Sequence, residues 1–301
     1  MAQYEADKVI ALLQFSCWKS HVEMNHSGLL KLRDKLIDFT EEDDRFNSKE
    51  ESIKPLNEKY LIDLLSDSNV ASKKDNQINK SKSYMNLLLE FSGFDSWETW
   101  EASFCNADEY LSFENIDLST FSAVEIGVCF PPQLEKKLLP HLSFVKKHTI
   151  YPVHLLPLGQ ESLSELLNYS VDLLKEYPFV VCAIPIQWSN QSEVFGGSVW
   201  NELVQSKRIV PVWIDETNVW EIKLSSVPWL KNHQTIGGLR GLLCGLLYMH
   251  EAIKQIHPSG AFSKKEKNQA IVSPPQIQNF QHSKGVFLLG HIHSKNTSMG
   301  D

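Results

Sequence analysis

The spacing of apolar residues divides the chain into a helical first part and a second part in which strands and helices alternate. Apolar side chains recur at helical intervals in three early stretches, Tyr4–Cys17, Leu29–Ile37 and Tyr84–Phe91. Gly93 is suited to end the third helix, and Asp95 or Ser96 to cap another that carries Trp97, Trp100 and Phe104 on one face. The polar stretches Glu41–Lys54 and Ser66–Ser83 are predicted to be loops. The first part therefore predicts a small all-α domain.

After residue 122 the pattern changes to short apolar runs separated by helical stretches. The predicted strands are 123–130, 149–155, 179–187 and 208–215, and the predicted helices are 134–147, 163–177, 199–205 and 238–255. Strands that are apolar on both faces and alternate with helices are typical of a doubly wound parallel sheet in an α/β fold. We therefore expect a helical domain over 1–115, an α/β domain over 120–256, and a polar, disordered tail over 257–301.

Composition and charge exclude several classes of protein. The chain has 301 residues, of which 42% are hydrophobic, so it is long and apolar enough for a sizeable core. It shows no apolar run of about 18 residues and no signal-peptide pattern, so we expect no membrane span. Five widely spaced cysteines without a CxxC pair favour reduced thiols and a cytoplasmic location. Residues 1–119 carry 23 acidic against 13 basic residues, which disfavours nucleic-acid binding.

The residues that follow the predicted strands are the candidates for chemistry, because ligands of such sheets bind at the carboxyl ends of the strands. The aromatic residues there are Phe130, Trp188 and Trp200, which either stack on a flat ligand ring or belong to the core. Glu202 follows on the helix behind the third strand, where it is either functional or a solvated charge. The tail histidines His282, His291 and His293 lack partner ligands, so we expect no metal site.

Four motifs in this order resemble a bacterial TIR domain over about residues 120–256. They are the loop LPLG at 156–159 before a helix, Ser189 near the end of the third strand, SVWNEL at 198–203, and RIVPVWI at 208–214 followed by VWEIKLSSVPWL at 219–230. The resemblance implies a TIR/flavodoxin-like sheet. The segment LLLEFSGFDSWETW at 87–100 resembles helical N-terminal modules of the effector-associated type in bacterial signalling and defence proteins.

The resemblance implies an NAD glycohydrolase that cleaves NAD to nicotinamide and an ADP-ribose product, with NAD as substrate and no cofactor. It carries the catalytic carboxylate over to Glu202, which suits an oxocarbenium-like transition state. The implied substrate-binding residues are Phe130, Trp188, Ser189, Trp200 and Gly159.

The resemblance also implies self-association through the loop that contains Leu156, Pro157 and Leu158, whose apolar side chains are unusual for a loop. The N-terminal domain would receive a partner or trigger that the sequence does not identify. A non-catalytic TIR adaptor is the alternative, because the first strand reads Val-Cys-Phe-Pro-Pro in place of the FISY start and following Asp that are usual in TIR domains. A response-regulator-like receiver is disfavoured, since that strand has no acidic pair at its end.

Overall fold

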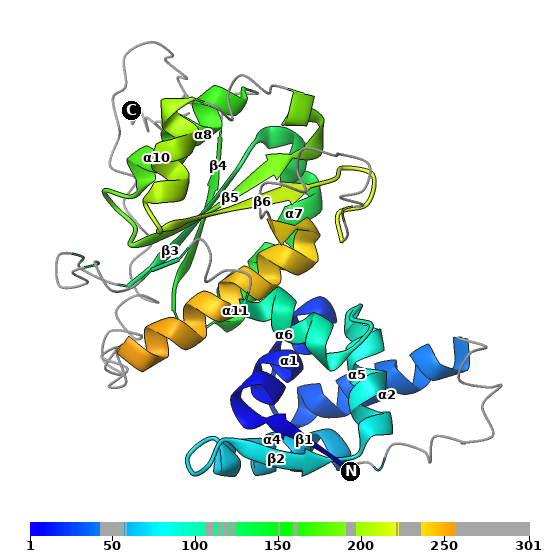
Figure 1. Cartoon of the computed structure of the whole chain (residues 1–301). Coiled ribbons are helices and arrows are strands. Elements are labelled where there is room, and N and C mark those ends of the chain that lie inside the picture. Colours follow the sequence, from blue (N-terminus) through cyan, green and yellow to red (C-terminus); the bar gives the residue numbers. More distant parts are fainter. Residues whose placement is uncertain are drawn as a thin grey trace, which may run out of the picture. The chain divides into compact units, whose positions relative to one another are not determined.

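The computed structural model describes residues 1–42, 57, 59–105, 111–112, 116, 121, 124–149, 151–158, 162–190, 197–220, 222 and 236–256. Residues Met1–Ile256 form one compact unit (Figure 1). The predicted tail over 257–301 and most of the predicted loop Glu41–Lys54 lie outside the described residues. Among the helices that are described, none has both the length and the apolar character that a bilayer span requires.

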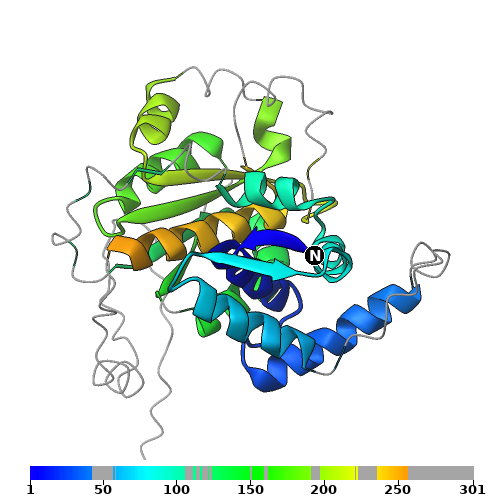
Figure 2. The same cartoon turned by 60° about the horizontal axis from the view of Figure 1, so that its bottom comes forward.

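The N-terminal part contains five described helices and a small sheet. The helices are α1 (Ala6–Lys19), α2 (His26–Glu42), α4 (Tyr60–Ala71), α5 (Lys82–Ser92) and α6 (Trp97–Cys105). Strands β1 (Ala2–Glu5) and β2 (Gln77–Lys80) pair antiparallel, with Ala2 opposite Lys80 (Figure 2). The expectation of an all-α first part is therefore wrong. The predicted loop Ser66–Ser83 is also wrong, because it contains the second half of α4, β2 and the start of α5.

The helix-ending signals act as the sequence predicts. Gly93 adopts a left-handed conformation with φ 89° and ends α5, and the Phe94 amide donates to the Leu89 carbonyl at 2.9 Å. The Ser96 hydroxyl accepts a hydrogen bond from the Thr99 amide at 3.2 Å, which caps the start of α6. The turn between α5 and α6 brings Phe94 against Trp100, with ring centroids 5.1 Å apart. Phe15 of α1 joins both rings in one aromatic core.

The second part is a five-stranded sheet in which all neighbouring strands are parallel. Its strands are β3 (Ile126–Phe130), β4 (Val153–Pro157), β5 (Phe179–Pro185), β6 (Ile209–Ile214) and the short β7 (Ile236–Gly237). They lie in the order β4-β3-β5-β6-β7. This is the strand order of flavodoxin-like folds. The predicted parallel α/β sheet is confirmed.

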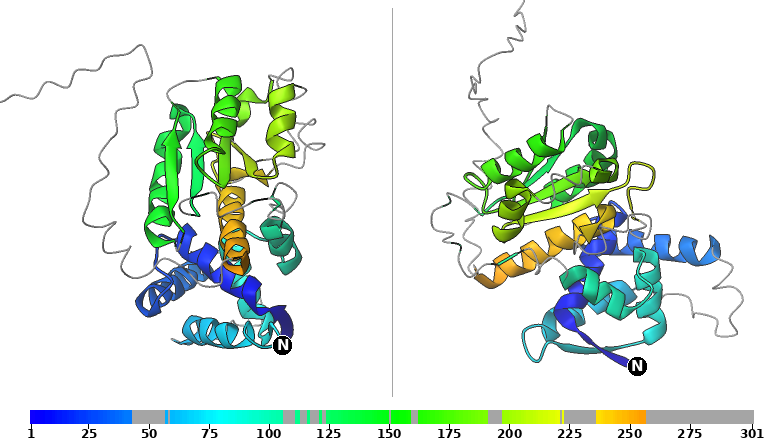
Figure 3. Two further views of the ribbon diagram at one scale, coloured as in Figure 1. Left: turned by 90° about the vertical axis from the view of Figure 1, so that its left-hand side faces the viewer. Right: turned by 45° about the horizontal axis from the view of Figure 1, so that its top comes forward.

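Helices cover both faces of this sheet (Figure 3). They are α7 (Pro132–His148), α8 (Leu163–Leu173), α10 (Ser198–Gln205) and α11 (Gly238–Ile256). α8 and α10 share an apolar cluster with alternate residues of β5, namely Val180, Cys182 and Ile184. On the other face a Cβ at Gly245 of α11 would lie 3.8 Å from the Val210 side chain. The chain moves outward from β3 to β4 and back past β3 to β5, so right-handed crossovers place α7 and α8 on opposite faces.

Helix α11 contacts both parts of the chain. One side lies on the sheet, and the other packs against α1 and α6. The Phe104 and Tyr248 rings are 5.9 Å apart, and Arg240 donates a hydrogen bond to the Gly93 carbonyl. Because α11 buries surface on two sides, its sequence is apolar almost all round. The separation of domains 1–115 and 120–256 as independently folding units stays a prediction.

Candidate functional site

The carboxyl edge of the sheet is the first candidate site, because β4 and β5 flank β3 and the strand order reverses there. The chain leaves β5 through a short 3-10 helix, Ile186–Asn190, and enters α10 at Ser198 before it returns in β6. Glu202 lies within α10, as the sequence predicts, and its side chain is outside the described part of the structure. The structure therefore places the backbone of Glu202 on α10, and its catalytic role stays a prediction.

The aromatic residues predicted to bind substrate are largely buried. Phe130 is fully buried at the end of β3, and its carbonyl accepts a hydrogen bond from the Leu158 amide at 2.8 Å. Trp200 is only 5% exposed and belongs to the cluster under α8 and α10. In this conformation neither ring offers a face to a ligand. Trp188 is half-buried against the same cluster, and Ser189 beside it is buried.

The predicted assembly loop packs on its own domain. Leu156 and Leu158 are half-buried and contact the cluster under α8 and α10, whereas Pro157 is exposed. This packing accounts for the apolar character of the two leucines without a second copy of the chain. Gly159, expected to bind substrate, lies outside the described residues. Self-association through this loop stays a prediction.

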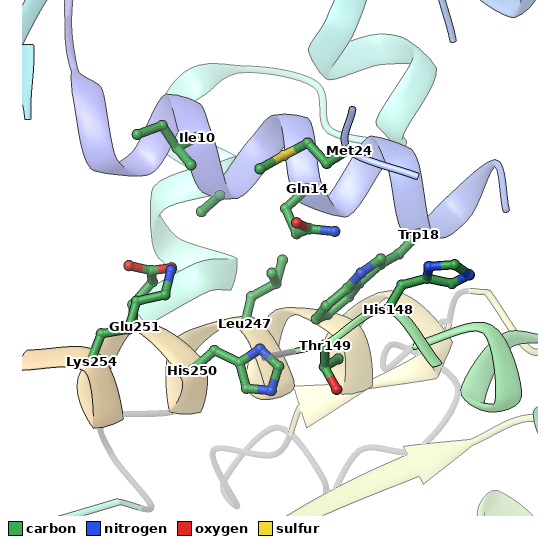
Figure 4. Close-up of a pocket in the computed structure, with 11 residues that line it drawn as sticks. Ile10, Gln14, Trp18, Met24, His148, Thr149, Leu247, His250, Glu251 and Lys254 are labelled. Atoms are coloured by element: carbon green, nitrogen blue, oxygen red, sulfur yellow. The ribbon is translucent and has the colours of Figure 1, made fainter. Parts of the chain in front are cut away.

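A pocket that the sequence analysis missed lies between α1 and α11 (Figure 4). Helix α1 contributes Ile10, Ala11, Gln14 and Trp18. Helix α11 contributes Leu247, His250, Glu251 and Lys254. Met24 and the end of α7, with His148 and Thr149, complete the lining. The cavity volume is about 80 Å³, several times the roughly 10–15 Å³ that a single water requires.

Two residues of this lining each carry a buried nitrogen atom that has no hydrogen-bond partner among the described residues. These atoms are Nε1 of Trp18, whose side chain is 1% exposed, and Nε2 of His250, whose side chain is 5% exposed. The two rings meet edge to face with centroids 5.8 Å apart, and Tyr151 contacts the His250 ring at 5.6 Å. Both nitrogens are closed off from solvent by the packing of these rings, so they belong to the core beside the pocket.

Burial also sets the charge of the pocket. Desolvation, followed by the nearby Lys254 ammonium, lowers the pKa of His250 from 6.5 to about 3, so the imidazole is neutral at pH 7. Glu251 and Lys254 form an ion pair with each other. The Thr149 hydroxyl donates to the Tyr151 carbonyl at 2.8 Å and keeps its lone pairs free to accept. The pocket therefore has little net charge.

A histidine cluster lies at the turn after α1. There His21 and His141 of α7 share a hydrogen bond of 2.9 Å between ring nitrogens. Burial and the neighbouring His21 lower the pKa of His141 to about 4. The Phe144 ring stacks on His21, and the Trp220 ring meets His141 edge to face. This cluster joins α7 to the turn after α1.

The thiols and the candidate metal ligands show no reactive arrangement within the described part of the chain. Burial raises the pKa of Cys17 to about 12 and raises those of Cys182 and Cys244 as well, so these thiols are protonated at pH 7. No three His, Cys, Asp or Glu side chains among the described residues converge on a point that could hold a metal ion. The three tail histidines lie outside that part.

Comparison of the chain with protein-family models, with curated proteins and with solved structures gives no match in any of the three.

Proposed function

We propose that this chain is a TIR-like NAD glycohydrolase that cleaves NAD to nicotinamide and an ADP-ribose product when copies assemble in the bacterial cytoplasm during signalling or defence. The observation that carries the proposal is the strand order β4-β3-β5-β6-β7 with α10 inserted between β5 and β6. In that arrangement the helix that contains SVWNEL follows the carboxyl end of a central strand, beside the point where ligands of such sheets bind.

The chemistry assigned to Glu202 is electrostatic. Cleavage of the bond between nicotinamide and ribose passes through an oxocarbenium-like state, in which positive charge develops on the ribose ring. A fixed carboxylate beside that ring stabilises the charge as it forms and accepts hydrogen bonds from the ribose hydroxyls. Water then attacks the anomeric carbon, so the reaction needs neither a metal nor a redox cofactor.

The alternative function is a non-catalytic adaptor that acts through assembly of its TIR-like part. The burial of Phe130 and Trp200 favours it, because two of the expected stacking rings contribute to the core in this conformation. The buried segment Cys129-Phe130-Pro131 at the end of β3 also lacks a polar side chain for a substrate.

Nicotinamide release from NAD, measured over a range of protein concentrations, separates the two functions. The Glu202→Gln variant removes the charge and keeps the shape, and we expect it to lower turnover by about 100-fold or more. The matched control is Glu176→Gln, which changes an exposed glutamate of the same domain, and it should leave turnover unchanged. Full activity of Glu202→Gln would refute the assignment. Assembly seen by light scattering without nicotinamide release would establish the adaptor instead.

A further inference from the structure

The N-terminal helices meet helix α7 at a joint that contains three histidines. The joint consists of the turn after α1, residues 20–25, and the face of α7 that carries His141, Phe144 and His148. The ring nitrogens of His21 and His141 lie 2.9 Å apart, and the Phe144 ring stacks on His21 with centroids 5.4 Å apart. His21 is exposed and His141 is half-buried, so protons from the solvent reach the pair.

His21 has an unusual backbone conformation at this contact. Its φ of 53° lies in the left-handed region, in which glycine is the commonest residue at the end of a helix. Its amide donates to the Trp18 carbonyl at 3.2 Å, and the Val22 amide donates to the Cys17 carbonyl at 3.0 Å. A glycine would satisfy this backbone by itself, whereas the imidazole adds the hydrogen bond to His141. Two titratable side chains therefore hold the joint.

The short distance between the two imidazoles limits how many protons they hold. A hydrogen bond between ring nitrogens needs one N–H donor and one bare nitrogen as the acceptor. A neutral pair and a singly charged pair both meet this condition. In a doubly charged pair, two N–H groups would face each other across 2.9 Å, and the bond would be lost. The closed joint therefore holds at most one added proton, whereas separated imidazoles bind one each near their ordinary pKa of about 6.5.

The charges around the pair oppose even the first proton. The Lys35 ammonium is the charge that acts on His21. The Lys19 ammonium lies 5.6 Å from the centroid of the Trp220 ring, which meets His141 edge to face. Burial, followed by Lys35, lowers the pKa of His21, and burial, followed by His21, lowers the pKa of His141 to about 4. Protons are therefore bound more weakly in the closed joint than in an open one.

The carboxylates near the joint interact with other groups. Glu23, the acidic residue of the turn, lies 3.7 Å from Nδ1 of His148. Asp215 at the end of β6 interacts electrostatically with Lys137, which adds a further cation one turn before His141 on α7. Protonation of His148 strengthens its pair with Glu23, which favours contact at that end of the joint. The response to acid is therefore confined to the pair of imidazoles.

We propose that this joint is a pH-sensitive switch: near pH 5 the imidazoles of His21 and His141 take up protons and separate, and the Trp220 ring loses its contact with His141. Trp220 belongs to the segment that follows β6, and the carboxyl ends of the strands form the edge at which ligands of such sheets bind. The joint therefore connects the N-terminal helices to that edge. It is separate from Glu202, and it does not depend on the NAD chemistry proposed for that residue.

Fluorine nuclear magnetic resonance of the full chain labelled with 5-fluorotryptophan tests the proposal. The chain has eight tryptophans, and the Trp220→Phe variant identifies the Trp220 signal by its loss. With a pKa of about 4 in the closed joint and 6.5 in the open one, His141 alone raises the ratio of open to closed joint by about 20-fold between pH 7 and pH 5. We expect a second Trp220 signal to grow by that factor, while the signal of Trp100, in the aromatic core of the N-terminal part, stays unchanged.

Two variants and a control make the test specific. His21→Asn removes a titrating ring and keeps a residue that accepts the left-handed conformation, and His141→Gln keeps a polar side chain that suits a helix. Each should show a smaller change than the wild type, and the double variant should have the same open-to-closed ratio at both pH values. His148→Gln should respond at least as strongly as the wild type, because it removes the pair with Glu23. An unchanged Trp100 signal at pH 7 reports that each variant is folded.

Three results would overturn the proposal. The first is a Trp220 signal that stays single and unmoved at pH 5. The second is an equal change in the double variant, which would assign the response to other groups. The third is a change of the Trp100 signal together with that of Trp220, which would mean that acid unfolds the whole protein and does not open the joint.

Discussion

The burial of His250 predicts how the stability of the protein depends on pH. Its pKa lies at about 3 in the folded chain, against 6.5 for an exposed imidazole. The unfolded chain therefore binds a proton at a higher pH than the folded chain. A group whose pKa is lowered by folding contributes its full stability above the unfolded pKa, and that contribution falls as the pH drops from 6.5 toward 3.

The size of this pH effect follows from the interval between the unfolded and the folded pKa of His250. Each pH unit inside it costs about 1.4 kcal/mol for one proton, so His250 should lower the free energy of unfolding by about 2 kcal/mol between pH 7 and pH 5. His141, with its pKa lowered to about 4, acts in the same direction. It is only half-buried, and solvent screening makes its share smaller.

Urea unfolding at pH 7 and pH 5 and constant ionic strength measures this quantity, with circular dichroism as the signal. The His250→Phe variant keeps the edge-to-face contacts with Trp18 and Tyr151 and removes the titrating group. We expect it to lose about 2 kcal/mol less than the wild type between the two pH values. His26→Gln, which replaces an exposed histidine at the start of α2, is the control and should behave like the wild type.

The comparison isolates His250, because the contribution of His141 is present in both proteins and cancels. A difference between wild type and His250→Phe below about 0.5 kcal/mol, a third of a pKa unit, would contradict the argument. It would mean that water or a polar partner solvates the imidazolium in the folded chain.

Two further predictions concern stability, one for the glycines of two helices and one for an arginine that binds backbone carbonyls. Gly93→Ala should destabilise the protein by about 1–2 kcal/mol, because an L-residue is strained at φ 89°. Gly245→Ala should stabilise it by about 0.5–1 kcal/mol, because a Cβ has room there and alanine favours the helix. Thermal melts of the two variants check both values, and equal effects on stability would contradict the reasoning. Arg208→Met should cost about 3 kcal/mol in urea unfolding, since the guanidinium donates to the carbonyls of Leu174, Tyr177 and Pro178 at 2.8–2.9 Å, and a loss below about 1 kcal/mol would show that water replaces these bonds.

Local signals in the sequence were sufficient for much of the fold. The apolar runs Ile126–Phe130, Phe179–Pro185 and Ile209–Ile214 are strands that the sheet buries on both faces, and such strands are recognisable because every side chain is apolar. The end of α5 at Gly93 and the start of α6 after Ser96 were also predictable, because both depend on the conformation or side chain of a single residue.

Strands β1 and β2 show where local signals fail. Both have four residues, and β2 reads QINK, in which only Ile78 is buried. Neither stretch has enough apolar alternation to indicate a strand. Each is stabilised by hydrogen bonds to the other, across more than seventy residues of chain, so only the tertiary structure decides that they form.

The two candidate sites also differ in how far local sequence signals, as opposed to tertiary packing, determine them. The sequence placed Glu202 on a helix after the third strand of the sheet, because the order of elements along the chain sets which residues follow which strand. It also allowed Phe130 and Trp200 two environments, and tertiary packing put both in the core. The pocket was not recognisable, because Trp18 and His250 each look like ordinary core residues of an apolar helix. Periodicity determines which side of a helix is buried, but the partner that it meets depends on how distant helices pack, and that packing alone brought Trp18 and His250 to one cavity.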